Sequence, residues 1–195
     1  MKYVCIDVET TGLNREKCQV IEFAAVIRDT DLDQEISESP SFHCLVKHDF
    51  YHGEPYALNL NARIFKELSD SENSRFDIFT ESELVDRFKQ FLLKNGFKES
   101  KHSKVVHFVA GGKNFAGFDL QFLNKLPNWE NTFFVSSRVL DPGMLWIEKD
   151  DKRVPGLNKC LQRANIEKEV THHALQDVYD TCQVIELGLK RLWEK

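Results

Sequence analysis

Two carboxylates stand at the end of a short apolar run near the start of the chain. Residues 3–6 are strand formers, and their nearly continuous apolar character is typical of a strand covered on both faces. Asp7 and Glu9 follow, and since residues two apart in a strand point to the same side, their carboxylates leave the strand together. Two like charges this close need a proton or a cation between them. The pattern therefore suits one divalent ion or two neighbouring ions, and its alternative is a solvated strand end.

A turn and two distant acids extend this pattern. Residues 10–13 read Thr-Thr-Gly-Leu, a glycine-containing turn at which the backbone can come close to a ligand. Asp119 and Asp177 each stand in the first turn of an expected helix, a position that the helix dipole also favours for an acid. A helix that starts beside the end of the first strand would bring Asp119 close to Asp7.

The elements that must position these residues follow from apolar periodicity and turn residues. After the opening strand, strands at residues 19–28 and 41–47 predict an antiparallel meander. The clearest helix covers residues 80–94, and a strand at residues 104–110 follows it, so a crossover onto a partly parallel sheet is expected. Thr80 and Glu83 are expected to form a capping box on this helix, and Gly96 to end it. Further helices are expected at residues 57–68 and 157–165, a strand at 131–140, and a helix cap at Asp141. A C-terminal helix is expected to be buried through Val178, Cys182, Ile185 and Leu189.

Two stretches have both a structural and a functional interpretation. Residues 47–56 mix basic and aromatic side chains that could stack bases, but a surface loop in which Phe50 and Tyr51 close over the core is favoured. Glu22 lies within the second strand and is interpreted as an edge or partly solvated acid rather than a catalytic one. The polar residues 69–80 are expected to form a mobile connection.

The composition is that of an ordinary globular protein. The 195 residues, of which 42% are hydrophobic and 29% charged, predict one domain over residues 1–195. Five cysteines without a C-x-x-C pair favour reduced thiols. Neither an apolar span nor a signal sequence is visible, so we expect a cytoplasmic or nuclear protein that is not secreted and has no membrane partner. The net charge of −5 is unusual for a protein that meets nucleic acid, but two divalent ions would add about +4.

Three motifs together resemble those of the DEDDh family of 3′–5′ exonucleases. DVETTGL at residues 7–13 is similar to the first motif, Asn114 followed by Phe-Asp at residues 118–119 to the second, and His-Ala-Leu-x-Asp ending at Asp177 to the third. Their order and spacing are similar to those of proofreading exonuclease subunits, oligoribonuclease and ribonuclease T. The resemblance implies a ribonuclease H-like α/β fold, a mixed sheet with an antiparallel meander followed by parallel strands and flanked by helices. It also implies hydrolytic release of nucleoside 5′-monophosphates from nucleic-acid 3′ ends.

The resemblance further implies a role for each motif residue. Two Mg²⁺ or Mn²⁺ ions about 4 Å apart would be held by oxygen ligands, with Asp7 between them. The substrate would be single-stranded or otherwise 3′-ended DNA or RNA, the choice staying open, and a homodimer is compatible because many members dimerise. The expected metal ligands are Asp7, Glu9, Asp119 and Asp177. The expected substrate contacts are Glu9 and the backbone around Thr10 and Thr11 at the terminal 3′ hydroxyl, Leu13 at the last base, and Asn114 as a hydrogen-bonding support.

The third motif contains two adjacent histidines. In the family the His and the Asp of this motif are separated by four residues, which selects His172 as the partner of Asp177. His173 and Asp177, in contrast, are four positions apart and would share a helix face. A general base has to reach over the site, so His172 is preferred if it lies in the loop before the helix. Two other functions stay open: a non-catalytic module on the same fold that binds 3′ ends or a partner, and an endonuclease, which the third motif disfavours.

Overall fold

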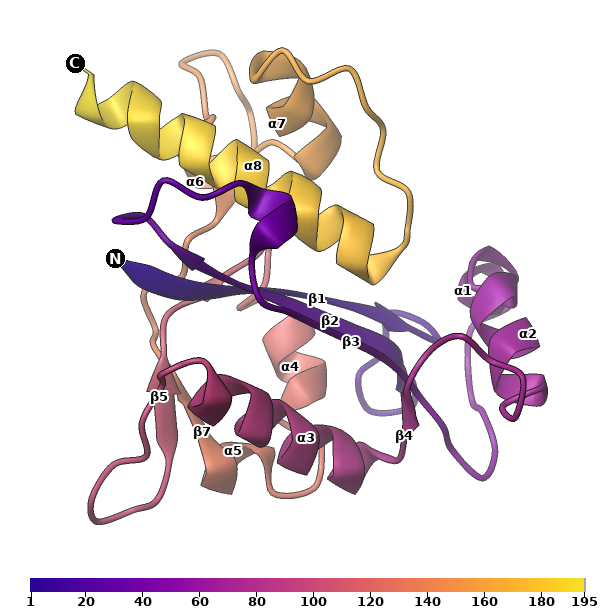
Figure 1. Ribbon diagram of the computed structural model, residues 1–195. Coiled ribbons are helices and arrows are strands. Elements are labelled where there is room, and N and C mark those ends of the chain that lie inside the picture. Colours follow the sequence, from indigo (N-terminus) through magenta and orange to yellow (C-terminus); the bar gives the residue numbers. More distant parts are fainter. Residues whose placement is uncertain (195) are drawn as a thin grey trace.

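A computed structural model gives the structure of residues 1–194, and a five-stranded mixed sheet lies at its centre (Figure 1). The strands β1 (Lys2–Thr10), β2 (Val20–Asp29) and β3 (Ser41–Val46) form the expected antiparallel meander. Two short strands flank it, β4 (Ile78–Phe79) parallel to β3 and β6 (Ala110–Gly111) parallel to β1. The strand order β4-β3-β2-β1-β6 places β1 inside the sheet, so the end of β1 lies between other elements.

Helices cover both faces of this sheet (Figure 1). The long helix α8 (Ala174–Trp193) packs on the face that carries Tyr3 and Cys5 of β1, while α3 (Glu81–Lys94) packs on the face that carries Val4 and Ile6. β1 is therefore buried on both faces, as its apolar run predicts. The remaining elements are η1 (Ile36–Glu38), α1 (Pro55–Leu60), α2 (Ala62–Ser69), α4 (Asp119–Leu123), α5 (Trp129–Thr132), α6 (Pro142–Leu145) and α7 (Leu157–Arg163).

Three expected elements differ from the structure. The strand expected at residues 104–110 divides at Val109 into β5 (Val106–Phe108) and β6, because β5 pairs with β7 (Phe133–Val135) in a second, two-stranded sheet. The strand expected at residues 131–140 is reduced to β7, since the residues before it form the short helix α5, which buries Trp129 against Phe88 and Phe133. The helix expected at 57–68 is interrupted at Asn61, where α1 ends and α2 begins.

The predicted caps of α3 and α6 and the predicted stop at Gly96 are confirmed. The N–H of Glu83 donates to Thr80 Oγ1 at 3.3 Å, and the Thr80 N–H donates to Glu83 Oε2 at 2.8 Å, which completes a capping box on α3. Gly96 follows the helix with φ +85°, a left-handed conformation that favours glycine. Asp141 caps α6 by accepting a hydrogen bond from the Gly143 N–H at 2.7 Å.

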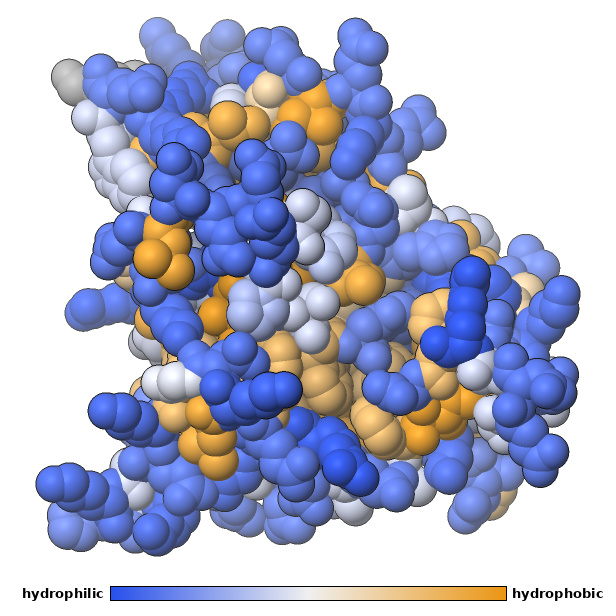
Figure 2. Space-filling view, in the orientation of Figure 1, coloured by the Kyte–Doolittle hydropathy of each residue, from blue (hydrophilic) through white to orange (hydrophobic). Residues whose placement is uncertain are grey.

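The surface is mostly hydrophilic on the side seen in Figure 2, and hydrophobic residues gather there in small groups between polar ones. Within residues 1–194, no helix combines the length and the apolar character that a membrane crossing requires. The five cysteines are free thiols, four of them buried, in agreement with the prediction of reduced thiols.

Candidate active site

Asp7 and Glu9 lie on the same side of the end of β1. Both side chains are half-buried, whereas the intervening Val8 points into the core with only 5% exposure, as alternation along a strand requires. The register of β1 on β2 shifts between Glu9 and Thr10, so the regular pairing of the two strands is broken directly after the two acids. The turn at residues 10–13 therefore begins directly after Glu9.

Asp119 reaches this strand end from the other side. It is the first residue of α4, and its Oδ1 accepts a hydrogen bond from the Val8 N–H at 3.1 Å in the protein interior. The side chain is 4% exposed. The sequence prediction that a helix start would bring this acid close to Asp7 is confirmed by this contact with the residue next to Asp7.

Asp177 and His172 come from the start of α8. Asp177 lies in the first turn, is 4% exposed, and accepts hydrogen bonds from the Thr171 N–H at 3.0 Å, the Thr171 hydroxyl at 3.1 Å and the His172 N–H at 3.1 Å. His172 lies in the loop before the helix with φ 54°. One ligand atom each of Glu9, His172 and Asp177 lies within 4.8 Å of the others, close enough to share a cation.

The neighbouring His173 has a different position. It is the residue that precedes the first residue of α8, and its backbone carbonyl accepts the Asp177 N–H at 3.0 Å. Loss of surrounding water and the charge of Arg63 lower the pKa of its imidazole. His172 lines the cavity formed by the four acids, whereas His173 is not among its lining residues.

The four acids and His172 line one cavity of about 440 Å³. Lys113 contributes a positive charge to its wall, and Leu157 and Val170 contribute apolar surface. The predicted contacts Thr10, Leu13 and Asn114 also line it, together with Glu54, Tyr56, Leu60, Asn61 and Phe118. Leu13 and Tyr56 are 76% and 78% exposed, so they present free apolar and aromatic surface to a ligand in this cavity.

The electrostatics of the cavity favour bound cations. Burial raises the pKa of Asp7 well above its ordinary value, and the nearby charges of Asp119, Glu9 and Asp177 raise it further. Burial likewise raises the pKa of Glu9 to about 7 and that of Asp119 to about 7. Carboxylate oxygens are the ligands that Mg²⁺ and Mn²⁺ prefer, and the residues present therefore fit such ions.

Thr11 does not have the position that a substrate contact requires. Its N–H donates to Gln19 O at 2.9 Å, its carbonyl accepts the Glu54 N–H at 2.8 Å, and its hydroxyl bonds both His52 O and the Gln19 N–H. The residue is fully buried and does not line the cavity. The expected contact of Thr11 with a terminal hydroxyl is thus corrected: all its polar groups are used within the protein.

These bonds attach residues 47–56 to the opening turn. A Cβ on Gly53 would lie 2.5 Å from Thr11 O, so the two segments touch there through their backbones, and one on Gly12 would lie 2.8 Å from the Glu54 side chain. Glu54 Oε1 also accepts the Leu13 N–H at 3.0 Å. We call this contact between residues 10–13 and 52–54 the turn clamp.

The other expectations for this segment have mixed outcomes. Tyr51 packs against Phe65 and the buried cluster around Ile64, as expected for a loop that closes over the core. Phe50, however, is 69% exposed and does not cover the core.

Sequence reasoning missed Asn61 and misjudged Glu22. Asn61 is 1% exposed, its Nδ2 donates to Thr10 O at 3.2 Å, and a hydrogen bond from its side chain lowers the pKa of Glu9. Glu22 is not a partly solvated acid, because its side chain is 1% exposed and paired with Arg63 and His43. The only available signal for Asn61 was a polar residue within a helical pattern.

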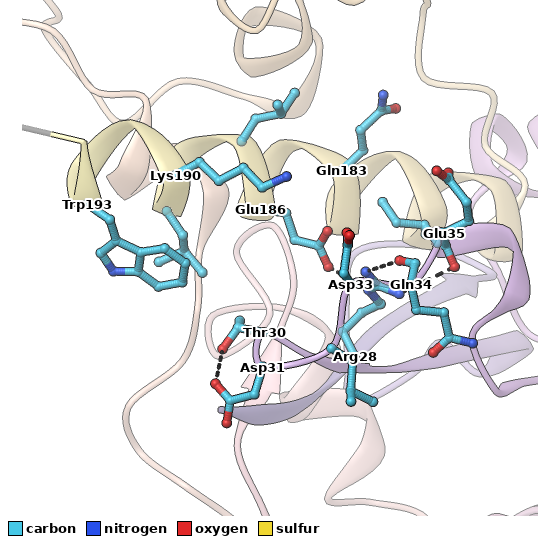
Figure 3. Close-up of a pocket in the computed structure, with 14 residues that line it drawn as sticks. Arg28, Thr30, Asp31, Asp33, Gln34, Glu35, Gln183, Glu186, Lys190 and Trp193 are labelled. Atoms are coloured by element: carbon cyan, nitrogen blue, oxygen red, sulfur yellow. Dashed lines mark hydrogen bonds and ion pairs between the residues drawn. The ribbon is translucent and has the colours of Figure 1, made fainter.

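A second cavity, of about 400 Å³, lies at the C-terminal half of α8 (Figure 3). Arg28 lies at its base, where it donates to Glu186 Oε1 at 2.5 Å and to Gln34 O at 2.9 Å. Residues Thr30–Ile36 face Glu186, Lys190 and Trp193 of the helix across this cavity. None of the predicted site residues lines it.

Comparisons with known proteins agree with this arrangement. The sequence profile of a family described as exonuclease (RNase_T) matches residues 4–185. No curated protein matches the sequence.

Several solved exonuclease structures share the fold. A zinc-bound E. coli ExoI–ssDNA complex has a TM-score of 0.63 at 16% identity and covers 99% of this chain and 42% of its own. The nuclease domain of 3'hExo, described as a DEDDh family member bound to rAMP, has a TM-score of 0.63 at 13% identity, with coverages of 99% and 92%. Exonuclease I from Methylocaldum szegediense has a TM-score of 0.62 at 15% identity, with coverages of 97% and 40%. The chain thus spans less than half of the exonuclease I chains and nearly all of the 3'hExo domain.

These neighbours share the mixed α/β sheet of a ribonuclease H-like fold, which confirms the predicted fold class. The resemblance of the three motifs to the DEDDh exonucleases is confirmed as well. With a profile that matches from the first residues of β1 into α8, this chain belongs to the exonuclease (RNase_T) family.

Proposed function

We propose that this protein is a 3′–5′ exonuclease that hydrolyses the terminal phosphodiester of a nucleic acid and releases nucleoside 5′-monophosphates. The observation that carries the proposal is the convergence of Asp7, Glu9, Asp119 and Asp177, with His172, on one cavity. These residues are distant in sequence and come from β1, α4 and the start of α8. A purely structural role does not explain four acids in one cavity, since mutual repulsion destabilises the protein without a cation.

Two Mg²⁺ or Mn²⁺ ions would be held by the four carboxylates. When bound, such ions supply Lewis-acid stabilisation of the phosphate and lower the pKa of a water. The fit rests on the oxygen donor set and on the raised pKa of Asp7, Glu9 and Asp119. Burial raises all three values, and neighbouring carboxylates raise those of Asp7 and Glu9 further, so bound cations would compensate these buried charges. With two divalent ions the net charge of −5 becomes about −1, which reduces repulsion of phosphate.

The protein's own groups then bind and orient the substrate. His172 is assigned the general base that accepts the proton of the attacking water, because a ring nitrogen lies within 4.8 Å of carboxylate oxygens of Glu9 and Asp177 and the residue lines the cavity. Leu13 and Tyr56 offer exposed surface to the last bases, and Lys113 can neutralise a phosphate. Thr10, Glu9 and Asn114 are assigned to the terminal sugar and its surroundings, while Thr11 only holds the turn.

The substrate class proposed is a single-stranded 3′ end of DNA or RNA. The similar structures include an ExoI complex with single-stranded DNA and a 3'hExo domain bound to rAMP, so neither sugar is preferred on this ground. Matched DNA and RNA oligomers therefore belong in one assay.

The decisive experiment uses strands labelled at either end, with Mg²⁺ or with EDTA. Wild-type protein is expected to release mononucleotides from the 3′ end only with the metal, and Asp7→Asn is expected to abolish release. Asp86→Asn, which changes an exposed acid on α3, is the matched control and should retain activity. Binding of 3′ ends without release would favour the non-catalytic module, and internal cuts would favour an endonuclease. Either result would overturn the proposal.

A further inference from the structure

Glu22 lies directly opposite Glu9 in the antiparallel β1–β2 pair. Like charges at facing positions destabilise a sheet, and the charge of Glu22 indeed contributes to the raised pKa of Glu9. Glu22 nevertheless has a lowered pKa, because hydrogen bonds from His43 and Arg63 outweigh its burial. The protein thus keeps a further, ionised carboxylate beside the cavity, although Glu22 does not line the cavity itself.

Arg63 joins this carboxylate to the segment that carries His172. Its Nη1 donates to Glu22 Oε1 at 3.2 Å and its Nη2 donates to Glu22 Oε2 at 2.5 Å, the fork geometry that only a guanidinium provides. The same Nη2 donates to the backbone carbonyl of His172 at 2.8 Å. Arg63 comes from α2, so a residue that is 109 positions away fixes the His172 peptide.

The His172 peptide is held from both sides. Its N–H donates to Asp177 Oδ2 at 3.1 Å and its carbonyl accepts from Arg63, while Glu22 Oε2 also accepts the Ala174 N–H at 3.3 Å. His172 has φ 54°, a left-handed conformation that few residues other than glycine adopt without support. Loss of the Arg63 bond would let this peptide relax and turn the imidazole away from Glu9 and Asp177.

We infer that Arg63, oriented by Glu22, is a positioning residue that sets the direction of the His172 imidazole over the cavity. The inference rests on the proposed function, since it assigns Arg63 a part in that reaction through His172. Arg63 does not line the cavity, so it acts on the base rather than on the substrate. Glu22 supports it by fixing the plane of the guanidinium.

The first test is a double-substitution cycle measured by nucleotide release. Arg63→Gln is expected to lower kcat by about 10- to 100-fold with a KM within about threefold, because a misplacement near 1 Å can cost about 100-fold. In a His172→Ala background the same substitution should cause no further loss. Arg63→Lys should fail to restore kcat, since an ammonium keeps the charge but cannot span Glu22 and the His172 carbonyl together.

Two controls separate positioning from folding and from charge. Arg87→Gln removes an exposed arginine on α3 and should leave release unchanged. Thermal melts show which variants fold. If Arg63→Gln does not fold, Arg63→Lys and Glu22→Gln are used in its place in the nucleotide-release assay. Full activity of Arg63→Lys, or an equal loss in both backgrounds, would overturn the inference.

The second test needs no activity. Hydrogen exchange of residues 170–176 in the protein without nucleic acid should be faster in Arg63→Gln than in the wild type and unchanged in Arg87→Gln. Unchanged exchange in Arg63→Gln would contradict the proposed link. If the wild type releases no nucleotides, the proposed function fails, and the exchange result still decides whether Arg63 holds the His172 segment.

Discussion

Replacing Asp119 by asparagine should stabilise the metal-free protein at pH 8. Asp119 is 4% exposed, and burial raises its pKa from the ordinary 3.8 to about 7. Above pH 7 the folded protein therefore holds a buried, uncompensated charge that the unfolded chain keeps in water. At 1.36 kcal/mol per pKa unit, this charge costs up to about 4 kcal/mol of unfolding free energy.

Asparagine keeps the acceptor for the Val8 N–H and removes the charge. The expected gain in unfolding free energy at pH 8 is about 1–4 kcal/mol. It is a range because the charge of Asp119 also raises the pKa of Asp7, so the two carboxyl groups share the cost. The gain should shrink on acidification, since wild-type Asp119 takes up a proton below pH 7 and its cost disappears towards pH 4. Saturating Mn²⁺ should shift the difference towards the wild type by up to about 2.7 kcal/mol, the stabilisation that ions at 100 times their Kd provide to a protein that binds them.

Urea denaturation at pH 8 and pH 5.5, with EDTA or Mn²⁺, measures these differences, and Asp86→Asn serves as the exposed control. A loss of stability in Asp119→Asn at pH 8 with EDTA would refute the reasoning. A gain that does not depend on pH would refute it as well, because it could not come from the titration of Asp119.

The other predictions concern the base and the scaffold. His172→Ala should lower nucleotide release by about 10²- to 10⁴-fold and His173→Ala by less than about tenfold, so the opposite order in a steady-state assay would exchange their roles. Arg28→Ala removes a buried guanidinium and leaves Glu186, whose side chain is 20% exposed, without its partner, so it should cost about 1–3 kcal/mol in urea denaturation, while a change below about 1 kcal/mol would show that the pair is dispensable. Thr80→Ala removes the cap of α3 and should cost about 1 kcal/mol in the same measurement, whereas no change would mean that water replaces the cap.

The elements that sequence predicts well are those whose cause is local. The apolar run of β1, the spacing of Asp7 and Glu9 and the capping box at Thr80 all depend on neighbours within a few residues, and the structure contains each of them. The strand around Val109 has the same local pattern on both sides of its break. Its division between two sheets depends on β7, about 25 residues later, so no local signal could reveal it.

The polar residues that support the site depend on contacts between residues that are even further apart in the sequence. Glu22 appears solvated in the sequence because Arg63, which neutralises it, is 41 residues away. Thr11 belongs to a motif whose neighbours line the cavity, but its own hydrogen bonds go to Gln19, His52 and Glu54. Motif residues can thus be recognised without revealing which of them face the ligand.

The turn clamp has a consequence for protein engineering. Because Gly53 and Glu54 lie directly on Thr11 and Gly12, the length of the segment before α1 cannot change without displacing the strand end that carries the acids. Attempts to alter which polymers this protein accepts would therefore do better to vary exposed side chains such as Tyr56 than to graft longer or shorter loops there. Engineering of this side of the cavity should therefore use substitutions, and insertions should be placed in other connections of the chain.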